Sequence, residues 1–100
     1  MTVTLDQTLE DRISYIVRVY MTRVGGKQIS LRRFARQMNK PLENAGIQGF
    51  THQSVYNWLN QKHLPSMRGL TTLMSVAAPN SWQWQFANDL LLTLKEILEN

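Results

Sequence analysis

The fold is decided by residues 49–60, which read GFTHQSVYNWLN. Thr51 is of a residue type that caps helix starts, and apolar side chains follow it at helical spacing. We therefore expect a short helix over residues 51–61. Its core face consists of Val55, Trp58 and Leu59. Its other face carries polar side chains without charge: His52, Gln53, Tyr56 and Asn57.

A second helix is predicted directly upstream, over residues 30–39. Ser30 is a good N-cap, and Pro41 prevents continuation beyond Lys40 because proline clashes with the preceding turn of a helix. The expected core face of this helix consists of Leu31, Phe34, Ala35 and Met38. Three cations project from its other side: Arg32, Arg33 and Arg36.

Three further helices are predicted outside this pair, which makes an all-α fold of five helices. The first follows an apolar stripe from Leu9 to Val24, with Thr4 or Asp6 as its cap and Gly25-Gly26 as its end. The fourth extends from about Ser66 to Ala77, between two prolines. The fifth follows at the C-terminal end of the chain.

This last predicted helix, residues 81–98, is too apolar for one buried stripe. One face carries Ala87, Leu90, Leu94 and Ile97, and a second carries Trp84, Leu91 and Leu98 at seven-residue spacing. A large exposed apolar surface usually marks an interaction site. We therefore expect the second face to contact a second copy or another protein. The alternative is a helix buried on two sides within its own bundle.

The length of 100 residues predicts one domain, residues 1–100, and the 43% of hydrophobic residues supports a packed core. The absence of cysteine excludes disulfides, cysteine zinc sites and thiol nucleophiles. The N-terminal segment is polar and acidic, unlike a signal peptide, and no apolar run approaches the length of a membrane span. We expect a soluble cytoplasmic protein that does not contact membranes.

Positive charge is concentrated in the middle of the chain. Residues 18–68 contain nine lysines and arginines and a single acid, Glu43, whereas the remaining ends contain two bases and six acids. Such a patch attracts polyanions, and a phosphate backbone is the first candidate. A solvated basic face without a partner is the alternative.

Residues 29–39, ISLRRFARQMN, and residues 49–60 together resemble the helix-turn-helix of the phage repressor and Cro family, the XRE-like regulators. The exit segment KHLPS at residues 62–66, with Leu70 and Leu73, extends the resemblance to about residue 77. It implies a five-helix lambda-repressor-like domain. It also implies binding to double-stranded DNA as a homodimer, at two half-sites about one helical turn apart.

Two features depart from the family pattern. Ala35 and Phe50 lie fifteen positions apart, farther than in the family, because residues 40–49 lengthen the turn between the two motif helices. Leu42 and Ile47 could pin this segment to the core. Gln61 also stands where the family usually has a glycine after the recognition helix.

The resemblance places the predicted helix 51–61 in the major groove, with its N-terminal residues at base edges. The implied base contacts are His52, Gln53, Ser54, Tyr56 and Asn57. Gln53 and Asn57 carry amides that can pair with adenine in two hydrogen bonds. The implied phosphate contacts are Arg32, Arg33, Arg36, Thr51, Asn60, Lys62, His63 and Arg68.

The resulting hypothesis is a sequence-specific, repressor-like transcriptional regulator. One alternative is a protein-interaction module, and another is a nucleic-acid binder that uses the basic patch without reading sequence. Two histidines, His52 and His63, without any cysteine are a poor set of metal ligands, and the acids form no pair typical of catalysis. We therefore expect no enzymatic activity, metal or cofactor.

Overall fold

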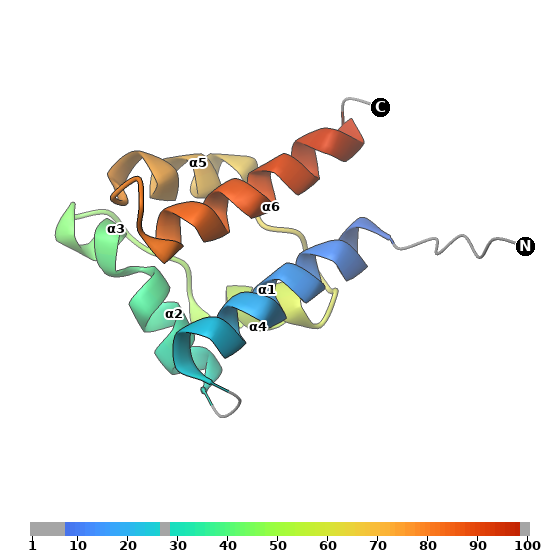
Figure 1. Cartoon of the computed structure of the whole chain (residues 1–100), viewed down its shortest axis with the longest axis horizontal. Helices are drawn as coiled ribbons and strands as arrows, with labels where there is room; N and C mark the ends of the chain where they lie inside the picture. The colour runs from blue at the N-terminus through green and yellow to red at the C-terminus, as the bar shows by residue number, and fades with distance from the viewer. Residues whose placement is uncertain (1–7, 27–28, 99–100) are drawn as a thin grey trace, which may run out of the picture.

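Every regular element in the described part of the chain is an α-helix (Figure 1). The computed structural model describes residues 8–26 and 29–98. The helices are α1 (Leu9–Gly25), α2 (Leu31–Met38), α3 (Lys40–Asn44), α4 (His52–Leu59), α5 (Met67–Val76) and α6 (Trp82–Leu98). None of these helices is long and apolar enough to span a bilayer.

Four helices begin at a hydroxyl side chain that caps the first turn. The capping residues are Thr8, Ser30, Thr51 and Ser66, and each accepts a hydrogen bond from the backbone N–H three residues later. The predicted caps Ser30 and Thr51 are therefore confirmed. The cap predicted for the first helix was wrong, because Thr8 and Asp11 form a reciprocal capping box that fixes the start at Leu9. Thr4 and Asp6 lie outside the described residues.

The structure has one helix more than the five predicted, because residues 40–44 form α3 instead of a loop. Pro41 lies in the first turn of α3, where its missing N–H has no intrahelical partner to lose. Gly46 ends the helix with a φ of 73°, and the Ile47 N–H then donates to the Leu42 carbonyl at 2.9 Å. Leu42 enters the core as predicted, whereas Ile47 remains exposed.

The core lies between α1, α6 and α5 on one side and the α2–α4 pair on the other. Helices α1 and α6 run antiparallel, and α5 lies beside α6 (Figure 1). Aromatic rings connect α2 to the long helices: Phe34 meets Phe86 edge-on at 5.5 Å, and Phe86 meets Tyr20 at 5.1 Å. These centroid distances are typical of favourable aromatic pairs. The aromatic cluster thus positions α2 against the rest of the bundle.

Helix α6 is buried on two sides by its own chain. Leu91 is only 6% exposed, and Trp84 packs against the core. The predicted contact of Leu91 with a second copy is therefore wrong, because this side chain is buried within its own chain. Trp84 is only half-buried, and its contact with a second copy stays a prediction. The third residue of that prediction, Leu98, has a side chain outside the described part. Among the side chains of α6 that the structure describes, the large apolar one that is exposed is Leu92.

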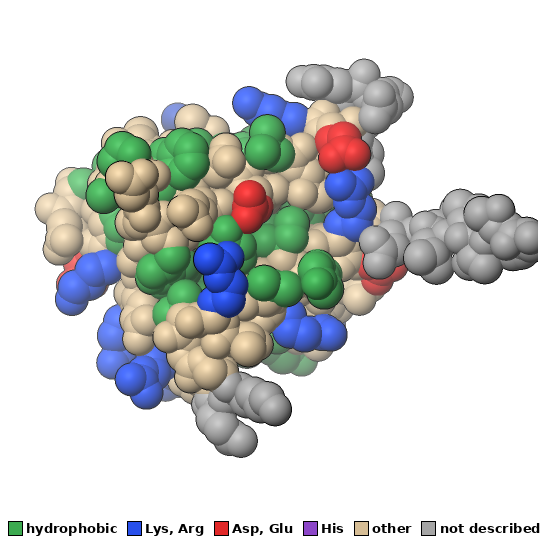
Figure 2. Space-filling view, viewed as in Figure 1, with side chains coloured by type: hydrophobic (Ala, Val, Ile, Leu, Met, Phe, Trp, Pro, Cys, Tyr) green, Lys and Arg blue, Asp and Glu red, His purple; other side chains and the backbone are tan. Residues whose placement is uncertain are grey.

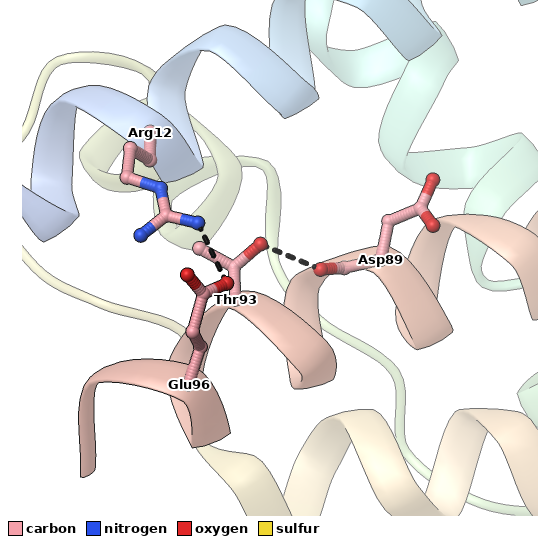
Figure 3. A network of polar contacts seen from close by, with 4 residues as sticks. All are labelled: Arg12, Asp89, Thr93 and Glu96. Carbon is pink, nitrogen blue, oxygen red and sulfur yellow. Dashed lines mark hydrogen bonds and ion pairs between the residues drawn. The ribbon is translucent and has the colours of Figure 1, made fainter. Parts of the chain in front are cut away.

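Polar contacts fix the register of α1 against α6. Arg12 of α1 forms an ion pair with Glu96 of α6 at 3.0 Å (Figure 3). Within α6, the Thr93 hydroxyl donates to the Asp89 carbonyl (Figure 3). The Tyr20 hydroxyl donates to Oδ2 of Asp89 at 2.6 Å. Burial of the ring, and next the Asp89 carboxylate, raise the pKa of Tyr20 to about 12. The neutral phenol is therefore part of the folded state.

We expect the wild type to lose stability between about pH 10 and 12, and the Tyr20→Phe variant to keep its stability over this range. The Tyr20 pKa is higher in the folded than in the unfolded chain, so its contribution is complete below pH 10 and disappears as pH rises through 12. The difference between the folded and unfolded pKa of Tyr20 corresponds to about 2–3 kcal/mol in the free energy of unfolding. Urea unfolding across this range measures it. Near neutral pH the variant should lose only about 1 kcal/mol, and parallel pH curves for the two proteins would contradict the assignment.

Candidate nucleic-acid interface

Helix α4 separates its apolar and polar side chains as the sequence predicts. Val55 and Trp58 are buried, and Leu59 packs partly against the core. The outer side presents His52, Gln53 and Tyr56 to solvent, with Asn57 half-buried beside them. The helix thus offers a row of uncharged hydrogen-bonding groups on a rigid support.

The start of α4 is held against the end of α2 by one side chain. Asn39 donates from Nδ2 to the Phe50 carbonyl at 2.6 Å, and the Phe50 N–H donates back to Asn39 Oδ1 at 2.9 Å. Residue 49 must be glycine for this approach, since a Cβ there would lie 2.5 Å from Cγ of Asn39. We call this contact the Asn39–Phe50 clamp. It closes the lengthened segment 40–49, so that α4 returns to α2.

Phe50 also connects α4 to α5. Its ring meets Trp58 edge-on at 5.1 Å, and a Cβ at Gly69 would lie 2.8 Å from its Cε1. Three surface hollows around α4 all include Phe50 in their lining. The aromatic ring is therefore the point where α2, α4 and α5 meet beneath the polar surface.

The other end of α4 is fixed by α1 and by an unusual turn. The buried Ser14 hydroxyl donates to the Leu59 carbonyl at 2.6 Å. After the helix, the Gln61 N–H donates to Trp58 O and the Lys62 N–H to Asn57 O, which is the Schellman pattern. Gln61 therefore adopts a φ of 61°, a conformation that favours glycine.

Gln53 and Asn57 are coupled to each other. Gln53 donates from Nε2 to Asn57 Oδ1 at 3.2 Å, one turn along the helix. This contact leaves the Gln53 Oε1 acceptor, one Gln53 N–H and both Asn57 N–H donors free for a ligand. Adenine offers an N6 donor and an N7 acceptor in the major groove. The amide pair is therefore oriented to offer both hydrogen-bond types.

Other predicted contact residues form hydrogen bonds within α4 and its two caps. The Thr51 hydroxyl accepts from the Ser54 N–H and lies 3.1 Å from the Ser54 hydroxyl. Asn60 donates to the Tyr56 carbonyl at 2.9 Å. Each of these side chains retains hydrogen-bonding capacity, but its position is set by the caps of α4.

Cations from several elements surround α4. Arg32 and Arg36 line one hollow together with His52, and Arg68 lines another with Gln48 and Phe50. The Lys62 ammonium lies over the Tyr56 ring, 5.5 Å from its centroid. The structure also places His63 beside Ser54 and Asn57 in a third hollow. Arg33, also predicted as a phosphate contact, is exposed on α2 but lines none of these hollows.

These cations are free to bind an external anion. Among the residues that the structure describes, none of Arg32, Arg36, Lys62 and Arg68 forms an ion pair. Each of them is exposed. The surface around the uncharged row of α4 therefore carries an unneutralised positive potential, which attracts phosphates.

Two residues of this region are not predicted from the sequence. The sequence places Asn39 only at the end of a helix, although its amide fixes the position of α4. It places Gln48 only in the inserted segment, yet this residue lines the same hollow as Arg68. No local pattern distinguishes these residues, because their roles arise only when segments distant in sequence pack together.

We expect Asn39→Ala to lower the free energy of unfolding by about 2 kcal/mol, because two partly buried backbone groups of Phe50 lose their partners. Urea denaturation provides the measurement. Asn44→Ala is the matched control, since Asn44 is exposed on α3 without a side-chain hydrogen bond among the described residues. Equal effects of the two substitutions would show that the clamp is not important for stability.

Gln61→Gly should stabilise the chain by about 0.5–1 kcal/mol, because it removes the steric cost of a positive φ at a residue with a Cβ. Thermal and urea unfolding measure the gain. Gln48→Gly is the control, because Gln48 is exposed but has no positive φ, so the added freedom of the unfolded chain should destabilise it. A loss of stability in Gln61→Gly would refute the conformational argument.

Comparisons with known proteins find no match for this chain. The chain matches no protein-family model, no curated protein and no solved structure. The similarity of residues 29–77 to the phage repressor and Cro family thus stays a prediction from the sequence motif. Within residues 8–26 and 29–98, the geometry provides an all-helical fold in which α4 presents polar side chains among cations that form no ion pair with a described residue.

Proposed function

We propose that this chain is a sequence-specific, repressor-like DNA-binding regulator that places α4 in the major groove of double-stranded DNA. The observation that carries the proposal is the outer face of α4, where uncharged hydrogen-bonding side chains lie among exposed cations that form no ion pair with any residue the structure describes. Uncharged amides suit base edges, and cations suit phosphates. We infer a lambda-repressor-like domain in which α3 is an additional helix.

The roles divide between α4 and its surroundings. Gln53 and Asn57 read bases, with adenine as the preferred partner of the Gln53 amide. His52, Ser54 and Tyr56 make secondary contacts along the same groove. The phosphates are bound by Arg32 and Arg36, which line a hollow with His52. Further phosphate contacts come from Lys62, which lies over Tyr56, and from His63 and Arg68, which line two other hollows with Phe50.

Selection of bound sites from random duplex DNA tests the readout. The wild type should enrich a short motif that contains adenine. A double variant, Gln53→Ala with Asn57→Ala, should still bind duplexes but enrich none, because each lost bidentate contact removes about 1–3 kcal/mol of discrimination. The matched control is Asn80→Ala with Gln85→Ala, two exposed amides outside α4 that should leave enrichment unchanged.

Salt dependence separates this proposal from the protein-interaction alternative. Four phosphate-binding cations predict that affinity falls roughly 100-fold between about 50 and 200 mM salt. Arg36→Gln should lower the slope of log affinity against log salt by about one.

Enrichment that survives in the double variant would refute base reading by α4. A complete absence of duplex binding would refute the function itself.

A further inference from the structure

A hollow with an apolar rim lies between α1 and α6. Its lining includes Tyr15, Val19 and Leu92, with Tyr15 66% and Leu92 56% exposed. Figure 2 shows hydrophobic side chains along this line, with acidic and basic side chains among them. We call this surface the α1–α6 groove. It is the region where large apolar side chains of the two longest helices meet solvent together.

The groove also contains one cation and one anion. Arg23 and Asp89 both line it, and the structure shows no ion pair between them. The Arg23 guanidinium lies over the Tyr20 ring at 4.8 Å, and one Asp89 oxygen accepts from Tyr20. A surface with one charge of each sign within an apolar rim is complementary to itself. A two-fold axis that passes between these two residues would bring each Arg23 opposite the partner's Asp89.

The groove lies on the side of α1 that is turned away from α4. Ser14 faces α4, since its hydroxyl bonds the Leu59 carbonyl. At about 100° per residue, Val19 and Arg23 lie roughly 140° and 180° around the helix from Ser14. In the view of Figure 1, α4 correspondingly passes behind α1. A molecule in the groove therefore leaves the outer face of α4 uncovered.

We propose that a second copy of this chain occupies the α1–α6 groove, so that the dimer presents two α4 helices on opposite sides and bridges two separate DNA duplexes. Helices α1 and α6 of both copies then form a four-helix bundle. This arrangement differs from adjacent half-sites on one duplex, which the family resemblance implies. The bridging part of the inference rests on the proposed DNA binding.

The size of the groove predicts a weak dimer. Each helix has 17 residues. Two such helices side by side, each about 25 Å long and 10 Å wide, offer roughly 500 Å² per copy. Stable interfaces bury about 800 Å² per partner. We therefore expect self-association with a dissociation constant on the order of 10 μM.

Analytical ultracentrifugation of the full chain tests the dimer. Leu92→Glu and Tyr15→Glu change exposed side chains and should weaken association at least about tenfold while the circular dichroism spectrum stays native. Arg23→Glu should do the same, since it places a carboxylate opposite the partner's Asp89. Ala78→Glu adds the same charge outside the groove and should have no effect. A wild type that stays monomeric well above 100 μM, roughly ten times the expected constant, would overturn the proposal.

Capture of a labelled duplex by an immobilised duplex tests bridging. The wild type should link the two, whereas Leu92→Glu should bind a single duplex with unchanged affinity and link none. A wild type that binds single duplexes without linking them, or that enriches inverted half-sites one turn apart, would overturn the bridging arrangement and leave the proposed function intact. Failure to bind any duplex would overturn bridging and the proposed function together, while ultracentrifugation still decides the dimer.

Discussion

The pair of hydrogen bonds between the Asn39 amide and the Phe50 backbone is the constraint on which the candidate interface depends. Helix-turn-helix motifs normally fix the second helix by a short turn. Here residues 40–49 separate α2 from α4, and the contact between the two ends of that segment holds the start of α4 against α2. Glycine at position 49 permits this contact, and Phe50 then connects it to the core through Trp58.

The same arrangement accounts for the electrostatics of the surface. Because α4 returns to α2, Arg32 and Arg36 come to line a hollow with His52. The exit turn at Gln61 brings Lys62 over Tyr56, and α5 adds Arg68, which lines a hollow with Phe50 just before α4. Cations that are scattered in sequence thus converge on one helix. This convergence makes a phosphate backbone a more suitable partner than an apolar protein surface.

Much of the local structure could be predicted from sequence, because caps and glycine stops act within a few residues. Ser30 and Thr51 illustrate this. Helix α3 was missed because Pro41 stops a preceding helix and equally starts a new one. The Asn39–Phe50 clamp and the burial of Leu91 depend on packing between distant segments, so no local pattern could reveal them. The polar face of α4 was predictable, but its surrounding geometry was not.

The central claim, that α4 is the surface that meets DNA, is tested most directly by titrating the isotope-labelled chain with duplex DNA and following its backbone amide signals. The account predicts that the largest shifts occur at residues 51–57, with smaller ones near Arg36 and Arg68, and that the signals of the α1–α6 groove hardly move at low protein concentration. Shifts concentrated on α1 and α6 with none on α4, or no shifts at all, would contradict it.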